Sequence, residues 1–398
     1  MTTDVELKSK SQITRKPVIL VALLVVIVLS LLLAVFIFMM DSDVASLDGV
    51  IHVSNEKELV KAVTNVAEPT IIILNENIVL TKSLVIPALS EITLTSSNDA
   101  NNFFKLIGAD GQDTITVTDN GVLRLDSIIV THVNGAKGSG VTVSSGGKLI
   151  MSGGEISGNV GLHGGGVNVG SGSFSMLGGV ISGNTADDKG GGVYVGDGPF
   201  SDLLSGSFSM LGGKISGNSA GVGGGVFLEN GFFSTSGGEI TNNLARAGGG
   251  VYAYGSFSMS GDVVIDNNKA SQTGGGVYMH NGPFELFGGK ISNNTAIVGG
   301  GVCNYGNFTM TGGMIANNTA DDKGGGVFSG QAFSNLPADV FVSGLFNMSD
   351  GVITNNTAPY GGGIHYYGTF NRLGGMITNN MSTSGGNEVS RESDTYNR

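Results

Sequence analysis

The sequence predicts an all-β fold, a parallel β-helix of stacked repeats, behind one N-terminal transmembrane helix. Three observations predict it. Nine units recur about every 25 residues, apolar and small polar residues alternate within each unit, and Gly accounts for 68 of the 398 residues. Short alternating segments that end at Gly or Asn are typical of strands, and Gly at this density opposes helix formation.

Composition narrows the class of protein. Pro is scarce and the Gly residues have no three-residue period, which excludes collagen. A single Cys, Cys303, excludes a disulfide scaffold and Cys-based zinc or iron–sulfur sites. The 32 acidic and 20 basic side chains give a net charge of −12, so we expect no nucleic-acid partner.

Residues 17–40 form an uncharged, apolar run that predicts a membrane-spanning helix. At about 1.5 Å per residue it can cross a hydrocarbon core of about 30 Å. The run is longer than the apolar region of a signal peptide, and Phe36–Met40 contains no Ala-x-Ala cleavage pattern. The sequence therefore favours an uncleaved anchor over a removed signal.

The charges beside this run predict its orientation. Basic residues precede it and acidic residues follow it, namely Lys8, Lys10, Arg15 and Lys16, then Asp41, Asp43 and Asp48. The positive-inside rule places residues 1–16 in the cytoplasm and the remainder outside the cell. We expect a single-pass surface protein that contacts the lipid bilayer through residues 17–40.

Each repeat reads Phe-x-Met, Gly-Gly-x-Ile, Asn-x-Ala and Gly-Gly-Gly-Val-Tyr. The Asn column is Asn159, Asn184, Asn218, Asn243, Asn268, Asn294, Asn318, Asn356 and Asn380. The steps between these residues are 25, 34, 25, 25, 26, 24, 38 and 24. We expect three short strands per unit, which suits one coil of a β-helix.

Stacked coils bring equivalent residues above one another about 4.8 Å apart. The Phe column is Phe174, Phe208, Phe233, Phe257, Phe284, Phe308, Phe346 and Phe370. We expect Phe to stack on Phe and Ile on Ile in the core, and the Asn column to form a hydrogen-bonded ladder at a bend. Nine Gly-rich coils over residues 151–386 and about four upstream predict a rod about 60 Å long.

Two units carry extra residues at one corner of the repeat. The additions are expected over 196–204 and 331–342, directly after Gly-Gly-Gly-Val-Tyr and Gly-Gly-Gly-Val-Phe. Insertions on one side of a solenoid often form its binding face. The alternative, that these apolar loops only pack against the flank, remains open.

Residues 41–150 are expected to hold a cap helix and the first coils. Asn55 and Glu58 form a capping box, followed by helical apolar spacing to about Val66. Strand-like runs follow at 70–74, 77–80, 84–86, 91–94, 114–117 and 122–130. Gly121–Leu125 already matches the Phe-x-Met register. Residues 387–398 are expected to be a polar tail.

The repeat resembles a known family. Ile181–Tyr194 is similar to polymorphic outer membrane protein repeats, in which Phe-x-x-Asn precedes Gly-Gly-Ala-Ile. The chain departs in having Ile for that Phe and Gly-Val for Ala-Ile, and we expect its N-terminal helix to replace the family's C-terminal barrel as the anchor. The resemblance implies a right-handed, pectin-lyase-like β-helix, surface display and adhesion.

The same superfamily includes polysaccharide lyases and hydrolases, which require clustered carboxylates. Residues 187–189 and 321–323 are two Asp-Asp-Lys turns at one corner, expected four coils and about 20 Å apart. A solvated turn is favoured over a weak calcium site. His163, His280 and His365 occupy different register positions, so we expect them to share no face.

We therefore expect no catalytic, cofactor or metal site. Cys303 stands where other repeats have Tyr or Phe, so we expect it to be one more stacking position. The glycosylation-type sequons are Asn293, Asn307, Asn317, Asn347, Asn355 and Asn380. Three of them, Asn293, Asn317 and Asn355, come from the repeated Asn-Asn-Thr turn and need no modification to explain them.

The favoured function is that of a non-enzymatic surface protein, adhesin-like or structural. It would contact an extracellular protein or glycan through its lateral faces and the two insertions. The alternative is a carbohydrate-binding or polysaccharide-degrading β-helix. Three or more carboxylates converging on one face would favour the alternative.

Overall fold

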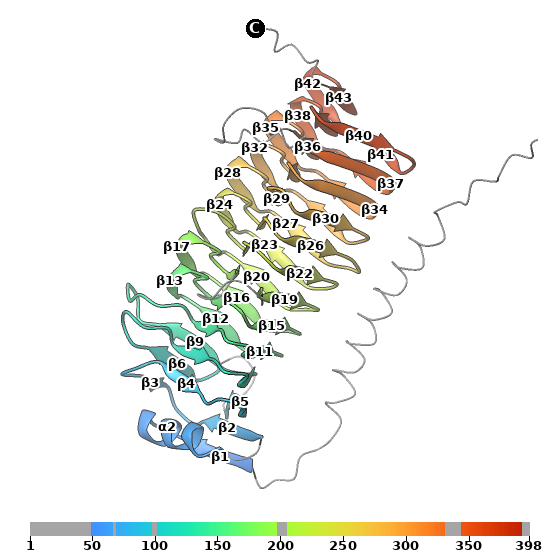
Figure 1. Ribbon diagram of the computed structural model, residues 1–398. Helices are drawn as coiled ribbons and strands as arrows, with labels where there is room; N and C mark the ends of the chain where they lie inside the picture. The colour runs from blue at the N-terminus through green and yellow to red at the C-terminus, as the bar shows by residue number, and fades with distance from the viewer. Residues whose placement is uncertain (1–48, 67–68, 98–101, 197–204, 331–343, 392–398) are drawn as a thin grey trace, which may run out of the picture. The chain divides into compact units, whose positions relative to one another are not determined.

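The computed structural model describes residues 49–66, 69–97, 102–196, 205–330 and 344–391, which form a parallel β-solenoid of about 13 turns (Figure 1). The solenoid is of the right-handed type. Each strand pairs in parallel with its equivalent in the next coil. Residues 50–398 form a compact unit of their own.

The 23-stranded sheet, called sheet A, contains two ladders side by side. The first ladder is β1 Val50–Val53, β2 Thr70–Leu74, β5 Glu91–Ser96, β8 Val122–Leu125, β11 Lys148–Met151, β15 Ser173–Met176, β19 Ser207–Met210, β22 Phe232–Thr235, β26 Ser256–Met259, β30 Pro283–Leu286, β34 Asn307–Ala316, β37 Leu345–Thr354 and β40 Thr369–Arg372. The second ladder, which β34 and β37 also join, is β3 Ile78–Val79, β6 Lys105–Gly108, β9 Ile129–His132, β12 Glu155–Ser157, β16 Val180–Ser182, β20 Lys214–Ser216, β23 Glu239–Thr241, β27 Val264–Asp266, β31 Lys290–Ser292 and β41 Met376–Thr378.

Two further faces complete the solenoid. The 12-stranded sheet B is β4 Leu84–Ile86, β7 Ile115–Val117, β10 Val141–Val143, β14 Val167–Val169, β18 Val193–Val195, β21 Val226–Leu228, β25 Val251–Ala253, β29 Val277–Met279, β33 Val302–Asn304, β36 Val327–Ser329, β39 Ile364–Tyr366 and β43 Val389–Arg391. Face C is β13 Val160–His163, β17 Thr185–Lys189, β24 Leu244–Ala247, β28 Lys269–Thr273, β32 Thr295–Val298, β35 Thr319–Lys323, β38 Thr357–Tyr360 and β42 Met381–Gly385. Bridges at Ser219 and Val222 connect β17 to β24.

A Gly-rich coil therefore has four strand segments on three faces, where the sequence predicted three strands. The additional segment arises because Phe-x-Met and x-Ile-x are separate strands of sheet A, divided by a Gly bend such as Gly179 (φ 80°). The residues after the Asn column pair along face C, as Ala245 does with Ala270.

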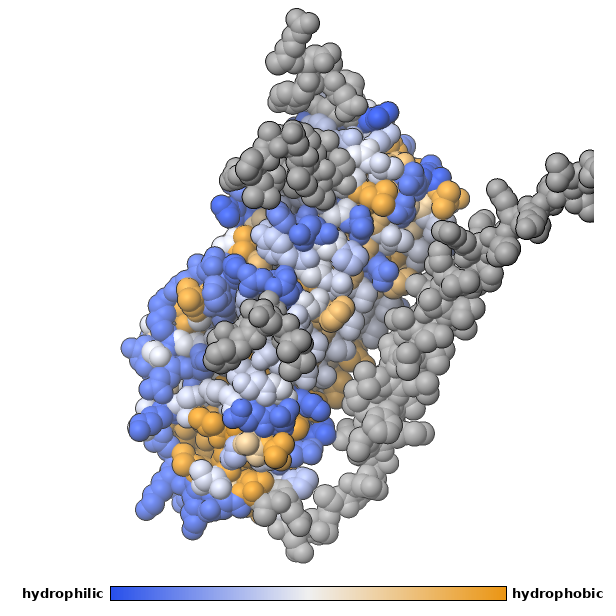
Figure 2. Space-filling model, viewed as in Figure 1, coloured by the Kyte–Doolittle hydropathy of each residue, from blue (hydrophilic) through white to orange (hydrophobic). Residues whose placement is uncertain are grey.

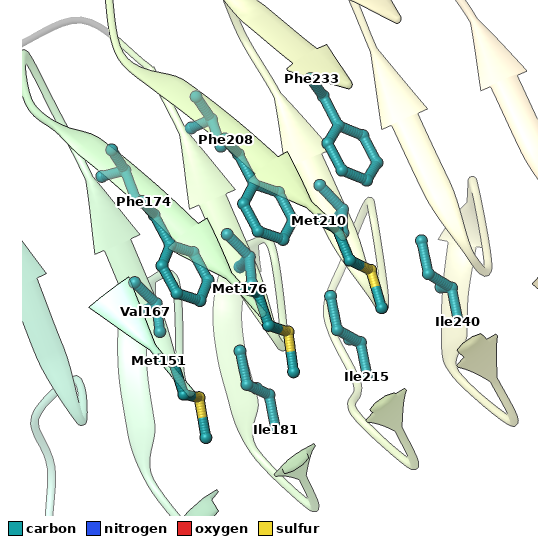
Figure 3. Packing of buried hydrophobic residues seen from close by; sticks show 14 of the residues in the cluster. Met151, Val167, Phe174, Met176, Ile181, Phe208, Met210, Ile215, Phe233 and Ile240 are labelled. Carbon is teal, nitrogen blue, oxygen red and sulfur yellow. The ribbon is translucent and has the colours of Figure 1, made fainter. Parts of the chain in front are cut away.

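The core consists of the predicted columns (Figure 3). Phe174, Phe208 and Phe233 are buried, and consecutive rings stack with centroids 4.7 Å apart. Met and Ile columns lie beside them, and the Val residues of sheet B close the core from the opposite face. Burying one such side chain stabilises the fold by about 1.5–3 kcal/mol, so the columns offset the ordering entropy of a Gly-rich chain.

The Asn column forms the predicted ladder. All nine residues are at most 5% exposed. Asn184 is typical: its Nδ2 donates to Oδ1 of Asn218 at 3.0 Å and to the carbonyl oxygen of Ile156 at 2.9 Å. The sharp bend lies one position earlier, where Gly or a second Asn, such as Gly183 (φ 60°) or Asn242 (φ 58°), takes the left-handed conformation.

Close packing explains the Gly triplets. Gly190 has a φ of 68°, which favours Gly. A Cβ on Gly191 would lie 2.5 Å from the carbonyl oxygen of Ser219, and one on Gly192 would lie 2.6 Å from that of Gly225. The triplet thus turns the chain and lets adjacent coils approach at the corner between face C and sheet B.

A helix covers the N-terminal end of the solenoid, as predicted. Helix α2 spans Glu56–Thr64, and Oδ1 of Asn55 accepts a hydrogen bond from the Glu58 N–H at 3.0 Å. Oε2 of Glu58 accepts one in return from the N–H of Ser54. Leu59 and Val63 of this helix are buried and belong to the core cluster of the solenoid. Strand β1, which precedes the helix, was not predicted.

The described part of the solenoid continues to Arg391, so β43 lies within the segment predicted as a polar tail. The predicted membrane span, residues 17–40, lies outside the described residues. Among the described ranges, no helix is long and apolar enough to cross a bilayer.

Candidate functional site

An unbroken row of aromatic rings runs along the side of sheet B that faces away from the main core, and five of its seven residues are themselves buried, at most 7% exposed. The middle residue of each strand points away from the core, because its neighbours, such as Val193 and Val195, are fully buried in it. We call the row the aromatic file; its members are Tyr194, Phe227, Tyr252, Tyr278, Tyr305, Phe328 and His365. Neighbouring centroids in the file are 4.5–5.9 Å apart.

One coil shows how the file stays continuous. Cys303 occupies the register position between Tyr278 and Phe328, as predicted. Its small side chain would leave a gap, but the ring of Tyr305 lies 5.6 Å from Tyr278 and 5.9 Å from Phe328 and bridges it. Tyr254 and Tyr367 occupy the same turn position as Tyr305, two residues after the outward residue of their strands.

The prediction that His163, His280 and His365 share no face was wrong. His163 stacks on Tyr194 at 5.2 Å, His280 lies 4.4 Å from Tyr254, and His365 belongs to the file itself. Their positions counted from the Gly triplet differ, because His163 ends a face C strand and His280 follows a sheet B strand. Both rings nevertheless contact Tyr residues on the outer side of sheet B. The histidines still lie in separate coils and form no cluster.

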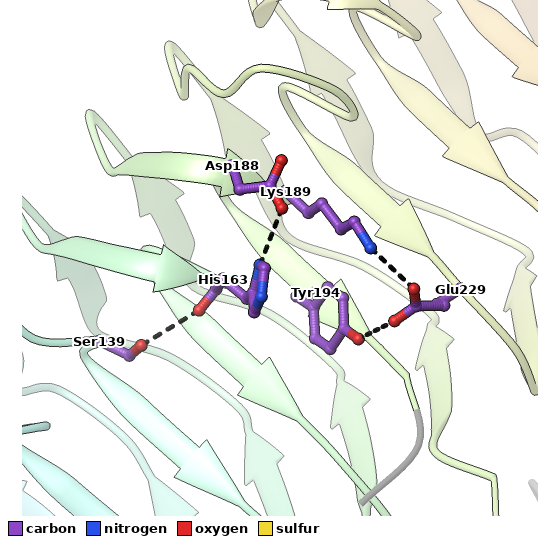
Figure 4. A network of polar contacts seen from close by, with 6 residues as sticks. All are labelled: Ser139, His163, Asp188, Lys189, Tyr194 and Glu229. Atoms are coloured by element: carbon purple, nitrogen blue, oxygen red, sulfur yellow. Dashed lines mark hydrogen bonds and ion pairs between the residues drawn. The ribbon is translucent and has the colours of Figure 1, made fainter.

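A polar network lies beside the first rings of the file (Figure 4). Lys189 donates to Oε1 of Glu229 at 2.7 Å, and the Tyr194 hydroxyl donates to the other oxygen of the same carboxylate. Lys189 also lies 5.2 Å from the ring centroid of Phe227. Nδ1 of His163 is 3.8 Å from Oδ2 of Asp188. Sequence reasoning missed Glu229, which no repeated motif marks.

These surroundings alter the acidity of several groups. Burial opposes ionisation of Glu229, but the hydrogen bonds from Lys189 and Tyr194 and the Lys189 charge lower its pKa overall. Burial raises the pKa values of Tyr252 and Tyr278, which therefore remain protonated. Burial lowers the pKa of His280, so this imidazole is neutral at pH 7.

Both Asp-Asp-Lys segments, which were predicted as turns, lie in strands, at the ends of β17 and β35. The second segment repeats part of this arrangement. Lys323 donates to the Tyr367 hydroxyl at 2.6 Å and lies 5.2 Å from the centroid of its ring. Lys189 and Lys323 occupy one register position of face C. In other coils this position holds Val222, Ala247, Thr273, Val298 and Tyr360. Among these described coils, Lys occurs only in the two that carry insertions.

Both insertions leave the solenoid at the edge of the aromatic file, at one corner, as predicted. The N–H of Gly206 donates to the carbonyl oxygen of Gly196 at 3.1 Å, and Gly344 donates likewise to Gly330. Aligned with the uninterrupted coils, the two long coils contain the additional residues 197–205 and 331–343. The sequence predicted these additions at 196–204 and 331–342.

The two Asp-Asp-Lys segments do not meet in one site. Residues 187–189 and 321–323 lie five strand steps apart on sheet B's ladder, from β18 to β36, or about 24 Å, rather than the four coils predicted. The Ser139 hydroxyl donates to the backbone oxygen of His163, not to its ring, so no Ser–His–Asp relay exists there. Within the described ranges, no group of three His, Cys, Asp or Glu side chains could hold a metal ion.

The sequons fall into two environments. Asn380 is the last rung of the buried ladder, so its side chain is inaccessible. Asn293, Asn317 and Asn355 are the exposed, left-handed residues of the bend. Asn307 is exposed and Asn347 is half-buried, both on the outer side of sheet A.

Comparison with known proteins gives no relative. No family model, curated protein or solved structure matches this chain.

Proposed function

We propose that this chain is a non-enzymatic, membrane-anchored surface protein, adhesin-like or structural, that binds an extracellular protein or glycan. Residues 17–40 anchor it in the bilayer with the N-terminus in the cytoplasm. The observation that carries the proposal is the aromatic file, which runs along sheet B with both insertions at its edge.

Aromatic rings in such a row are suited to binding. From His163 to His365 the rings extend over seven strand steps, or about 34 Å. Interface hot spots are enriched in aromatic residues. Five of the rings are at most 7% exposed, so they support the row, and a partner would contact its half-buried members. Tyr254, Tyr305 and Tyr367 are half-buried, which leaves part of each side chain open to a partner. The acidic net charge disfavours a nucleic acid as that partner.

The insertions support the same surface. Two coils share one arrangement: an Asp-Asp-Lys segment before the sheet B strand, an outward aromatic residue within the strand and an insertion after it. Duplicated contacts on one rod permit bivalent binding, which raises avidity without new chemistry. A protein or glycan with repeated features suits such an arrangement.

A second candidate, polysaccharide binding with cleavage, rests on the network in Figure 4. There His163, Asp188, Lys189, Tyr194 and Glu229 place acidic, basic and aromatic groups in one region. Glu229 already accepts hydrogen bonds from two neighbours and has a lowered pKa, which disfavours it as a general acid.

One experiment separates the two candidates. The purified protein in detergent is applied to arrays of glycans and extracellular-matrix proteins, and soluble sugar release is measured in the same wells. Binding without release, lost when 197–205 or 331–343 is deleted, supports the proposal. Release of oligosaccharides would establish the enzyme instead, and no binding to any array would contradict both.

A further inference from the structure

Exposed apolar side chains gather at the N-terminal end of the solenoid. Of the eighteen large hydrophobic side chains exposed among the described residues, seven lie between residues 50 and 89. We call them the apolar collar; they are Val50, Ile51, Val60, Ile71, Val79, Val85 and Leu89. Figure 2 shows apolar surface concentrated at this end of the visible face.

The outward columns of sheet A and sheet B change from apolar to polar residues near this end of the solenoid, the second ladder of sheet A one coil later than the other two columns. In the first ladder of sheet A, Val50 pairs with Ile71, Ile71 with Thr93, and Thr93 with Arg124. The outward position is therefore apolar in the first two coils and polar in the next two. Core packing cannot explain this, because these side chains point away from the core.

The neighbouring columns also change from apolar to polar residues, at the same coil on sheet B and one coil later in the second ladder. On sheet B, Val85 is 53% exposed and the next outward residue is Thr116. In the second ladder of sheet A, Val79 is 59% exposed and is followed by Ile107 and then Thr131. The collar thus surrounds the end of the rod on more than one face.

Leu89 provides an independent sign of function. It is 81% exposed and has a φ of 58°, a conformation that a Leu side chain rarely adopts. The other non-Gly residues with positive φ among the described residues are Asn, Asp or Ser. Its neighbour at this corner in the next coil is Asp119, whose carbonyl oxygen accepts the Leu89 N–H at 3.2 Å. A strained, exposed Leu reduces stability, so the stability of the fold does not explain why Leu occupies this position.

We propose that the apolar collar inserts into the interfacial layer of the lipid bilayer that residues 17–40 span. This inference rests on the membrane anchor of the proposed function. Only nine residues, 41–49, separate that segment from β1, and they reach at most about 30 Å. The two apolar coils occupy about 10 Å of the rod, which matches the depth of interfacial insertion, about 5–10 Å.

Charge near the collar fits a membrane surface. Lys57, Lys61 and Lys82 are exposed within the same stretch, and Lys side chains extend their ammonium groups to headgroups while their stems cover apolar surface. The exposed carboxylates of Glu58 and Glu76 also lie there, so we expect insertion to stop where these groups remain hydrated.

The chain contains no Trp, so one introduced Trp reports its surroundings without background. Full-length Leu89→Trp in phosphatidylcholine nanodiscs should show blue-shifted emission that brominated lipid quenches strongly. The matched control is Leu373→Trp, at a site 84% exposed near the last coil, which should emit as in water and remain unquenched. Equal, unquenched emission from both variants would overturn the inference.

A second measurement keeps this failure distinct from failure of the anchor. If the wild-type protein is extracted from membranes by alkaline carbonate, both the anchor and the collar inference fail. If it resists extraction while Leu89→Trp stays unquenched, only the collar inference fails. A third variant adds Leu89→Asn to Val85→Trp. Quenching of the Trp should weaken, while the unfolding midpoint should rise because Asn tolerates the left-handed conformation. Unchanged quenching would contradict a role for Leu89 in bilayer contact.

Discussion

The side chain of Asn218 joins three consecutive coils. Its Nδ2 donates to Oδ1 of Asn243 in the next coil at 3.1 Å and to the carbonyl oxygen of Ile181 in the preceding coil at 2.9 Å. The backbone N–H of Asn218 donates to the same Asn243 oxygen at 3.0 Å. Each rung therefore depends on the next, and the ladder fixes the register of the whole array.

Replacing one rung should strongly destabilise the solenoid. In Asn243→Ala, the buried N–H and Nδ2 groups of Asn218 lose their acceptor, and the carbonyl oxygen of Ile215 loses its donor. Each buried unsatisfied group costs about 1–3 kcal/mol, so we expect a loss of at least about 3 kcal/mol in urea unfolding. The exposed Asn281→Ala is the control, and equal stability of the two variants would contradict the ladder's role.

Two adjacent residues test the core column. Phe233 is 1% exposed between Phe208 and Phe257, whereas Phe232 is 65% exposed on the other side of the same strand. We expect Phe233→Ala to lower the unfolding free energy by about 3–5 kcal/mol and Phe232→Ala to change it by less than about 0.5 kcal/mol. Similar losses from both variants in chemical denaturation would mean that the register is wrong by one residue.

Most of the fold could be predicted because every coil repeats the same pattern of inward and outward residues. The Phe, Ile and Asn columns reveal their inward positions through their period, and the capping box of Asn55 and Glu58 marks the cap helix. The prediction of three strands per coil was wrong, because a strand of three residues such as β16 is too short to show alternation separately from the strand before it.

The candidate site could be predicted only in part. The shared corner of the two insertions follows from their common place in the repeat. The aromatic file does not, because outward residues vary between coils: Cys303 interrupts the column and Tyr305 enters from the turn. Glu229 joins Lys189 from the next coil, 40 residues later, and no local motif signals a contact made across coils.

Acid should weaken the contact between Lys189 and Glu229. The folded state lowers the pKa of Glu229 below its ordinary value of 4.5. Its contribution to stability is therefore complete above the unfolded pKa and disappears as the pH falls through the lowered folded value. We expect wild-type stability to drop more between pH 7 and pH 3 than that of Glu229→Gln, measured by urea unfolding at each pH. Parallel pH profiles would contradict this assignment.

Cys303 should be inert in the folded protein. It is fully buried, and burial raises the pKa of its thiol, so the reactive thiolate is scarce at pH 8. We expect iodoacetamide to leave the native protein unmodified over hours and to label it within minutes in urea, as followed by mass spectrometry. Rapid labelling of the native protein would show that the coil around Cys303 opens readily.

Removing an insertion should leave the solenoid intact. Gly196 and Gly206 already share a hydrogen bond across the base, so deleting 197–205 restores the length of an uninterrupted coil, in which Tyr254 and Gly255 fill the same turn. We expect an unchanged far-ultraviolet circular dichroism spectrum and a similar unfolding midpoint. A loss of folded protein would instead make the insertion part of the structural core.

The most direct test of the account compares Tyr305→Ala with Phe232→Ala for binding to the array glycan or matrix protein that the wild type retains best. Both variants lose one aromatic side chain, but Tyr305 belongs to the aromatic file and Phe232 projects from sheet A. If the file is the binding surface, we expect Tyr305→Ala to weaken binding at least about tenfold, typical of a hot spot, while Phe232→Ala binds like the wild type. Wild-type binding by Tyr305→Ala and loss in Phe232→Ala would place the partner on sheet A and contradict the proposed face.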